Sequence, residues 1–523
     1  MLYNYMENRI KSILSGLFGR LFAEKVHQIP KFRYRQRKTA EKSTERLQSS
    51  IKSGKNSAKT GRNGLVKEKI LIKNGYLVNP GAKEEGYADL LLEDGRIKEI
   101  VYRGTKPDVA GTDKKADFTA DEGRDKEIAV EAEGCEIIDA SGKYIFPGLV
   151  DVHSHFRDPG FTYKEDIYTG AKAAAAGGYT SVVLMCNTKP VVDTPETLSY
   201  VLKKGAETDI HVYSCSSVSM GLKGKELTDM EEMKKSGAVG FTDDGIPLMD
   251  AGFLEEAMKK AAALNLPVSL HEEDKTMISE NGINRGRASE FYGIGGSPKE
   301  AEISLIARDL EIALKTGVTV DIQHVSAKES VALIKDAVRR DAENGDGKKR
   351  KIHAEATPQH FTLTEDAVIE KGAVAKLNPP LRTEEDRLGI IEGLRDNTID
   401  LIATDHAPHA PEEKAKSITE APSGMLGLET ALSLSYEKLV LEAEIPLPEV
   451  IAKLTCNPAG VYGLNAGTIR KGASADLCIF DPDAEYVVKE FHSKSVNSPF
   501  LGRKMKGQVV TTICNGKIIY ERQ

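Results

Sequence analysis

The ten residues DVHSHFRDPG, Asp151 to Gly160, decide which fold and chemistry we expect of this chain. They follow the apolar run YIFPGLV (144–150), which is typical of a strand buried on both faces. Side chains two apart on a strand point the same way, so His153 and His155 can reach one metal ion at the strand's end. Arg157 follows with a planar guanidinium suited to a carboxylate beside that ion. A lone His-x-His pair is a weak signal, so a metal site can be predicted only if the rest of the chain supplies further ligands.

The composition is that of an ordinary soluble globular protein. The chain has 523 residues, 40% hydrophobic and 29% charged, enough for one large domain with appendages. No apolar run approaches the length of a membrane span, and the N-terminus lacks the pattern of a secretory signal. The six scattered cysteines form no CxxC pair and indicate reduced thiols in a cytoplasmic protein.

The N-terminal 66 residues differ in charge from the rest. They hold 15 Lys/Arg against 4 Asp/Glu, whereas the whole chain has a net charge of −7. Apolar residues at helical spacing between Ile10 and Phe22 predict an amphipathic helix, and residues 31–66 have the composition of a disordered basic segment. We favour a solvated extension. The alternatives are a helix at residues 1–25 that contacts a membrane or a partner, an organelle-targeting segment and a start codon placed too early; nucleic-acid binding is not expected.

Both ends of the remaining chain predict short strands. Residues 67–145 contain alternating runs joined by Asn-Gly, Asp-Gly and Ser-Gly turns, interrupted by a polar surface insertion at 104–134. Residues 465–523 return to the same style, with ADLCIF and VVTTIC followed by another Asn-Gly turn. We therefore expect the two ends to pair into one small β-sheet domain.

The middle of the chain, residues 146–464, alternates strand and helix patterns. The candidate strands are 144–152, 180–186, 210–215, 238–242, 267–271, 318–324, 351–356 and 400–404. Helical patterns such as AEISLIARDLEIALKTG separate most of them. Eight strands with intervening helices fit an α/β fold, the (β/α)8 TIM barrel, in which catalytic groups gather at the carboxyl ends of the strands.

Metal-binding residue types stand at those ends. In chain order they are His153 and His155, Asp243 and Asp244, His271, His324, and Asp405. This nitrogen and oxygen ligand set suits zinc and can hold one or two ions. A catalytic zinc lowers the pKa of bound water and polarises a carbonyl. The sequence leaves open which of Asp243 and Asp244 takes part. We expect His27, His211, His353, His360 and His492 to be structural or surface residues.

Taken together, the motifs DVHSHFRDPG, GAVGFTDDG, LHEED, IQHVSAKES, KLNPPLR, ATDHAPH and APSGMLGLET resemble those of the class I dihydroorotases, members of the amidohydrolase superfamily. The resemblance covers about residues 68–520. It implies that His153, His155 and Asp405 bind a first Zn²⁺ and that His271 and His324 bind a second. Asp244 would bridge the two ions. Many members of the superfamily bridge with a carboxylated lysine, and the fourth strand here offers none, which argues against hydantoinases.

The resemblance also implies a reaction, the reversible cyclisation of N-carbamoyl-L-aspartate to (S)-dihydroorotate and water in de novo pyrimidine (UMP) biosynthesis. Asp405 would carry the proton. The substrate contacts it implies are His155, Arg157, Asn187, Asn378, His409, and the backbone near Ser423 and Gly424. Three positions depart from the family pattern: Asp158 stands for glutamate, Cys186 for proline and Ser423 for phenylalanine.

Two other readings compete with this one. The first is another cyclic amidohydrolase, of the dihydropyrimidinase or allantoinase type, which Arg157, Asn187 and the missing lysine disfavour. The second is a non-catalytic homologue that partners aspartate carbamoyltransferase, which would have lost metal ligands. Because some class I dihydroorotases associate with that enzyme, the N-terminal extension could serve docking in an active enzyme too. A homodimer is also open.

Overall fold

The computed structural model describes residues 69–103, 134–344 and 349–522. The expectations for the basic extension at 1–66, for His27 and for the insertion at 104–134, except its last residue, therefore lie outside the described residues.

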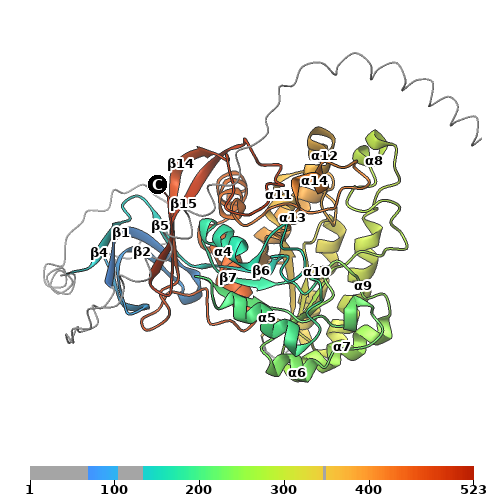
Figure 1. Ribbon diagram of the computed structural model, residues 1–523, viewed down its shortest axis with the longest axis horizontal. Coiled ribbons are helices and arrows are strands. Elements are labelled where there is room, and N and C mark those ends of the chain that lie inside the picture. The colour runs from blue at the N-terminus through green and yellow to red at the C-terminus, as the bar shows by residue number, and fades with distance from the viewer. Residues whose placement is uncertain (1–68, 104–133, 345–348, 523) are drawn as a thin grey trace, which may run out of the picture. The chain divides into compact units, whose positions relative to one another are not determined.

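One eight-stranded sheet is built from both ends of the described chain. Its order is β16-β15-β14-β5-β1-β2-β3, with β4 pairing with β1. The strands are β1 (Lys69–Asn79), β2 (Glu84–Glu93), β3 (Arg96–Tyr102), β4 (Glu136–Asp139), β5 (Tyr144–Pro147), β14 (Leu477–Val487), β15 (Lys504–Cys514) and β16 (Lys517–Glu521). Figure 1 shows the early strands in blue beside the late strands in red. Residues 400 positions apart thus share one sheet, and its own apolar cluster includes Ile72, Leu90 and Ile479.

Eight parallel strands form the barrel. They are β6 (Leu149–Ser154), β7 (Tyr179–Leu184), β8 (His211–Ser214), β9 (Phe241–Thr242), β10 (Val268–Leu270), β11 (Val320–Ile322), β12 (Ile352–Ala356) and β13 (Leu401–Ile402). They lie in a three-stranded sheet, β6-β7-β8, and a five-stranded sheet, β9 to β13. Isolated parallel bridges, Ser216 to Phe241 and Ser154 to His406, join the edges of the two sheets. The strands therefore close into a ring, as the alternating pattern predicts.

Helices follow the barrel strands and cover them. The longer ones are α4 (Ile167–Ala176), α5 (Pro195–Gly205), α7 (Ala251–Leu264), α9 (Glu300–Thr316), α10 (Lys328–Asn344), α13 (Glu384–Arg395) and α16 (Leu447–Leu454). The shorter ones are α6 (Met230–Lys235), α8 (Arg287–Tyr292), α11 (Pro358–Thr362), α12 (Asp366–Lys371), α14 (Pro411–Lys414), α15 (Ala431–Ser435), α17 (Cys456–Val461), the 3₁₀ turns η1 (Pro80–Ala82), η2 (Met220–Leu222) and η3 (Gly372–Ala375), and the π-helix η4 (Tyr436–Glu442). Side chains from these helices and from the barrel strands form the largest apolar cluster, which also takes in Phe480 and Val509 of the sheet.

The expectation of one strand over 144–152 is wrong. The chain forms two strands there: β5 pairs with β1 and β14 in the eight-stranded sheet, and β6 begins the barrel. Gly148 separates them, and a Cβ at this position would lie 2.1 Å from Thr180 Oγ1. The apolar run hides this break because both strands are buried, so periodicity cannot distinguish one long strand from two short ones.

Candidate metal centre and active site

The expected ligands stand at the carboxyl ends of five barrel strands. His153 lies in β6 and His155 directly beyond it, while Asp244, His271 and His324 follow β9, β10 and β11 within two residues. Asp405 follows β13 by three residues, with a backbone φ of +43°. Parallel strands of a barrel end at one rim, so these side chains meet there.

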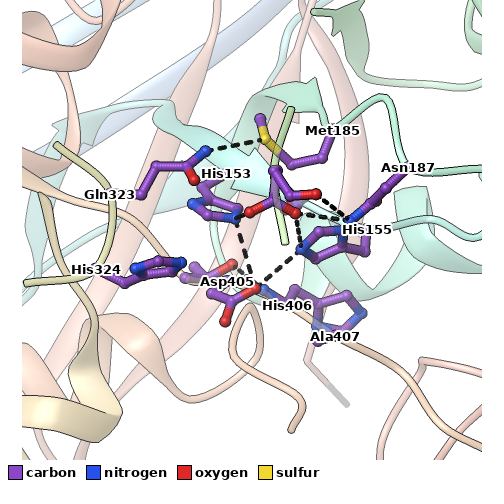
Figure 2. A network of polar contacts seen from close by, with 12 residues as sticks. His153, His155, Met185, Asn187, Gln323, His324, Asp405, His406 and Ala407 are labelled. Carbon is purple, nitrogen blue, oxygen red and sulfur yellow. Dashed lines mark hydrogen bonds and ion pairs between the residues drawn. The ribbon is translucent and has the colours of Figure 1, made fainter. Parts of the chain in front are cut away.

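Their donor atoms converge. His155 Nε2 lies 3.0 Å from Asp405 Oδ1, and His153 Nε2 lies 3.6 Å from the same oxygen. On the other side, His271 Nδ1 lies 3.0 Å from His324 Nε2. Figure 2 shows His153, His155 and Asp405 directed toward one another, with His324 close by. Two sets of ligand atoms, those of His153, His155 and Asp405 and those of His153, Asp244 and His324, each lie within 4.8 Å of one another.

Asp244 and Asp243 differ in direction. Asp244 Oδ1 lies 3.4 Å from His153 Nε2, and Asp244 Oδ2 lies 3.5 Å from His155 Nε2. Asp243 instead accepts hydrogen bonds from the backbone of Val218 and Ser219, at 2.8 and 3.0 Å. The structure therefore brings Asp244 into the cluster and uses Asp243 to shape the loop after β8.

Three of the ring N–H groups have partners outside the cluster. His153 Nδ1 lies 2.9 Å from Glu355 Oε2 and His155 Nδ1 lies 3.0 Å from Asn187 Oδ1. His271 Nε2 lies 3.1 Å from Glu273 Oε2. A histidine that donates one N–H in this way presents its other nitrogen as an unprotonated ligand. The hydrogen bonds thus direct His153 Nε2, His155 Nε2 and His271 Nδ1 toward the shared centre.

The buried charges favour the metal-binding forms of Asp244 and His324. At His153 burial lowers the pKa, but the carboxylates of Glu355 and Asp244 outweigh burial and raise the pKa above its usual value. Burial alone would raise the pKa of Asp244, but the positive potential of His153 and the neighbouring imidazoles outweighs it and holds the pKa well below its usual range. Burial and the neighbouring His271 lower the pKa of His324. Asp244 is therefore an anion and His324 a neutral imidazole, the forms in which these groups bind metal.

A metal ion fits this donor set. His153 Nε2 is fully buried and has no hydrogen-bond partner among the described residues, although it faces two carboxylates. A buried polar atom left without a partner is costly, and coordination of a cation would satisfy it. Imidazole nitrogens combined with carboxylate oxygens are a common zinc ligand set.

A cavity of about 250 Å³ opens over the donors. Besides His155, Asp244, His271, His324 and Asp405, it is lined by Arg157, Asn187, Gly245, Asn281, Asn378, Ala407, His409, Ser423 and Gly424. All the expected substrate contacts thus border one space. Arg157 has a φ of +58° and donates from Nε to the Pro408 carbonyl at 3.2 Å. Among the described residues, no carboxylate pairs with its guanidinium, so the Nη groups remain available to an anion.

Three expected substrate contacts are engaged with protein atoms. The Asn187 amide nitrogen donates to Asp244 Oδ2 at 2.7 Å while its oxygen accepts from His155, so this residue braces two ligand candidates as well as lining the cavity. His409 Nε2 donates to the Ser423 carbonyl at 2.8 Å, and its Nδ1 lies 3.2 Å from Lys164 Nζ. The Asn378 amide lies 3.3 Å from His271 Nε2.

The three departures from the family pattern are accommodated locally. Asp158 is buried and accepts from Tyr200 Oη at 2.9 Å and Lys204 Nζ at 2.5 Å. Cys186 is buried and its thiol donates to the Thr242 carbonyl at 2.9 Å. Ser423 keeps its carbonyl for His409. The side chains of Asp158 and Cys186 therefore each have a defined hydrogen-bond partner, and Ser423 contributes through its backbone.

Four of the histidines expected to be structural or surface residues are described, and they make contacts of their own. His211 pairs with Asp476 at 3.0 Å, His353 with Asp400 at 2.7 Å, and His492 with Glu429 at 2.9 Å. His360 Nε2 lies 3.1 Å from the Pro379 carbonyl. These contacts agree with the expected structural or surface roles.

Glu355 and Glu273 belong to the site but are not among the residues predicted from the sequence. Both are buried carboxylates, one inside β12 and one in the LHEED motif. An acidic residue within the buried strand IHAEA was the available signal, because such a charge needs a partner.

None of the six cysteines forms a disulfide, and no helix within the described ranges is long and apolar enough to cross a membrane.

Comparison with known proteins gives a consistent family. A family model described as dihydro-orotase-like matches residues 142–330. The dihydroorotase of Clostridium acetobutylicum is 48% identical over 454 residues, which cover 86% of this chain and 99% of that protein. The dihydroorotase of Lactococcus lactis is 45% identical over 453 residues, with the same coverage.

Solved structures share the fold. The L-hydantoinase (dihydropyrimidinase) from Arthrobacter aurescens has a TM-score of 0.70 at 25% identity, covering 86% of this chain and 96% of its own. Dihydropyrimidinase from Brevibacillus agri has a TM-score of 0.69 at 23% identity, covering 87% and 95%. These neighbours are cyclic amide hydrolases by name, while the sequence relatives are more similar by a wide margin. The chain therefore belongs to the dihydroorotase family of metal-dependent cyclic amidohydrolases.

Proposed function

We propose that the protein catalyses the dihydroorotase reaction, the reversible cyclisation of N-carbamoyl-L-aspartate to (S)-dihydroorotate with loss of water, in de novo pyrimidine biosynthesis. The observation that carries this proposal is Arg157, whose guanidinium lacks a carboxylate partner among the described residues and borders the cavity beside the metal-ligand candidates. Dihydroorotate differs from a dihydropyrimidine mainly by a carboxylate, and a guanidinium is the side chain best matched to that group.

We propose Zn²⁺ as the metal. His153, His155 and Asp405 would hold one ion, and His271 and His324 a second, with Asp244 shared between them. Bound there, zinc would polarise the ring amide carbonyl and lower the pKa of water, which are the two requirements for amide hydrolysis near neutral pH. Metal analysis of the purified protein distinguishes one ion per subunit from two.

The chain's own residues would orient the substrate. Arg157 pairs with the carboxylate, and Asn378 and His409 border the same cavity. The backbone at Ser423 and Gly424 closes one side of it. Gly424 has a φ of +130°, and a Cβ there would lie 2.8 Å from Ala407 Cβ and 3.0 Å from His409 Nε2. Glycine is therefore required for this close approach.

Asp405 would move the proton. In the hydrolytic direction the attacking water gives a proton to Asp405 as its oxygen adds to the ring carbonyl carbon. Asp405 then passes the proton to the ring nitrogen as the carbon–nitrogen bond breaks, which yields the carbamoyl group and a carboxylic acid. The acid releases the second proton of the water to solvent and becomes a carboxylate. Cyclisation follows the reverse order. An aspartate directed into the cavity and at hydrogen-bond distance from His155 has the position that such a transfer needs.

Two rival functions remain distinguishable by experiment. A dihydropyrimidinase or allantoinase acts on a ring without the carboxylate, and for such a ring the unpaired guanidinium of Arg157 would have no counterpart. A non-catalytic partner of aspartate carbamoyltransferase has no need of a complete ligand set, yet all six candidates meet at the rim of this barrel.

The test is cyclisation of N-carbamoyl-L-aspartate by zinc-loaded protein, followed by the appearance of dihydroorotate. We expect turnover that is lost on removing the metal and regained on adding Zn²⁺. Zinc binding without turnover would favour the non-catalytic reading; addition of aspartate carbamoyltransferase to that sample, together with size-exclusion chromatography, then tests for a required partner or a homodimer.

A further inference from the structure

Two buried lysines lie behind the loop Ala421–Gly424, which borders the cavity. Lys414, at the end of α14, donates from Nζ to the carbonyls of Pro422 and Gly424, both at 2.9 Å. Lys376 donates from Nζ to the Ile418 carbonyl at 2.8 Å. Lys414 is 7% exposed and Lys376 3% exposed. Lysine is almost never buried to this degree without a carboxylate partner.

Neither ammonium group has such a partner among the described residues. Glu413, next to Lys414 in sequence, pairs instead with Lys164 at 3.0 Å and accepts from Tyr163 Oη at 2.9 Å. Lys414 therefore donates its hydrogen bonds to backbone carbonyls, and no carboxylate among the described residues neutralises its charge. Burial, and next the charge of Lys376, lower the pKa of Lys414 to about 7, which Glu413 only partly opposes.

The Pro422–Ser423 peptide links Lys414 to the cavity. The Pro422–Ser423 peptide is not among the cis bonds, so its N–H points opposite to the carbonyl that Lys414 holds. The Ser423 N–H thus points away from Lys414, on a residue that lines the cavity, and it has no hydrogen-bond partner within the described ranges. An ammonium group bonded to the carbonyl of a peptide polarises that peptide and strengthens its N–H as a donor.

We propose that Lys414 is a positioning residue that selects a carboxylate-bearing ring. It fixes the Ala421–Gly424 loop with the Ser423 N–H toward the substrate, and it supplies a buried positive charge that the substrate carboxylate neutralises. The proposal rests on the proposed function and names a determinant of its specificity. A neutral ring in the same cavity gains nothing from this charge. An anionic ring gains from it and in return stabilises the protonated lysine.

The first test compares Lys414→Met with Lys416→Met, an exposed lysine two residues away that controls for the loss of one surface charge. We expect Lys414→Met to raise KM for dihydroorotate by about tenfold or more while kcat changes by less than about threefold. The variant no longer fixes the Ser423 N–H toward the substrate carboxylate and lacks the positive charge behind the loop, so a hydrogen bond to a charged group is weakened. Lys416→Met should match the wild type. Lys414→Arg, which keeps a charge, should recover part of the affinity. An unchanged KM in Lys414→Met would overturn the proposal.

The second test needs no variant to fold. Affinity of the wild-type protein for orotate, a planar anionic ring, should fall as the pH rises from about 6 to about 8, because Lys414 loses its proton over that range and the free energy of anion binding is linked to it. Affinity for uracil, the same ring without the carboxylate, should not. Lys376, Glu413 and His409 are the charged or titratable groups that face Lys414. A pH-independent orotate affinity, or one that keeps its slope in folded Lys414→Met, contradicts the proposal.

Failure of the proposed function itself would look different. Wild-type protein would then turn over no dihydroorotate at either pH, whereas failure of this inference leaves wild-type turnover intact and Lys414→Met indistinguishable from it.

Discussion

His153 shows how one side chain is prepared for a metal before any metal arrives. Glu355 accepts from its Nδ1, and Nε2 is left buried and without a hydrogen-bond partner among the described residues. Beneath this pair, burial and the neighbouring Glu355 raise the pKa of Asp321 well above its usual range, so Asp321 is protonated and adds no second negative charge. The carboxylate of Glu355 therefore faces His153 as the nearest imidazole, and the same Oε2 accepts from the His324 backbone N–H at 3.4 Å.

We predict that Glu355→Gln weakens zinc binding by about 10- to 100-fold, as is typical when the partner of a metal-ligating histidine is removed. Competition with a chromophoric chelator measures this, independently of activity. Glu256→Gln, at an exposed position on α7, is the matched control and should bind zinc as the wild type does. Equal affinities for Glu355→Gln and the wild type would contradict the orientation assigned to His153.

The second residue-level prediction tests the proton transfer proposed for Asp405. Asp405→Asn keeps the shape of the side chain but cannot take a proton, so kcat should fall by on the order of 10²- to 10⁴-fold while the thermal unfolding temperature stays near that of the wild type. Metal content must be measured beside it, because Asp405 is also a ligand candidate. Near-wild-type turnover would exclude Asp405 as the proton carrier.

The sequence predicts which residues form this site better than it predicts how their side chains are oriented. Strand ends bring His153, His271 and His324 together because a parallel barrel places all carboxyl ends at one rim. Which ring nitrogen faces inward depends on Glu355, Asn187 and Glu273. The buried position of Glu355 in IHAEA signals that it needs a partner, but the local sequence does not show which histidine each of the three residues contacts. The same holds for Lys414, which reads as one more charged residue in HAPEEKAK.

At the scale of elements, strand positions were predictable and one boundary was not. The expected strands at 180–186, 318–324 and 351–356 overlap β7, β11 and β12 closely. The break at Gly148 was missed because both flanking strands are apolar and buried. Here the chain leaves the eight-stranded sheet and enters the barrel, and we propose this glycine, rather than residue 145, as the boundary between the two domains.

We predict that Gly148→Ala destabilises the protein by about 1–3 kcal/mol, because the new methyl group overlaps Thr180 and buried overpacking has that magnitude. The urea midpoint of unfolding measures the change. Thr180→Ala in the same chain should restore part of the loss, since it removes Oγ1 and Cγ2, the nearest atoms. Additive effects of the two substitutions would show that the overlap is not the cause.

At the scale of the whole described chain, one ion pair joins the sheet to the barrel. His211, the first residue of β8, lies 3.0 Å from Asp476, which precedes β14. The hydrogen bond and charge of Asp476 raise the pKa of His211 above its usual value of 6.5. Because the folded protein binds this proton more tightly than the unfolded chain does, protonation of His211 stabilises the fold. The stabilisation is complete at pH values below the pKa of His211 in the unfolded chain, and it is lost as the pH rises through the pKa in the folded protein.

Asp476→Asn should therefore lower the unfolding temperature more at pH 6 than at about pH 9. Thermal unfolding of wild type and variant across that range measures the difference, with His211→Gln as the partner variant expected to flatten the same pH dependence. A difference that grows with pH would contradict the assignment, because its sign would require His211 to be destabilised as a cation.

The central claim is that this cavity selects a carboxylate-bearing cyclic amide, and the most direct test is hydrolysis of dihydroorotate, hydantoin and allantoin in parallel by the purified zinc-loaded protein. We expect turnover of dihydroorotate and no turnover of the two rings without a carboxylate. Turnover of hydantoin or allantoin in preference to dihydroorotate would contradict it.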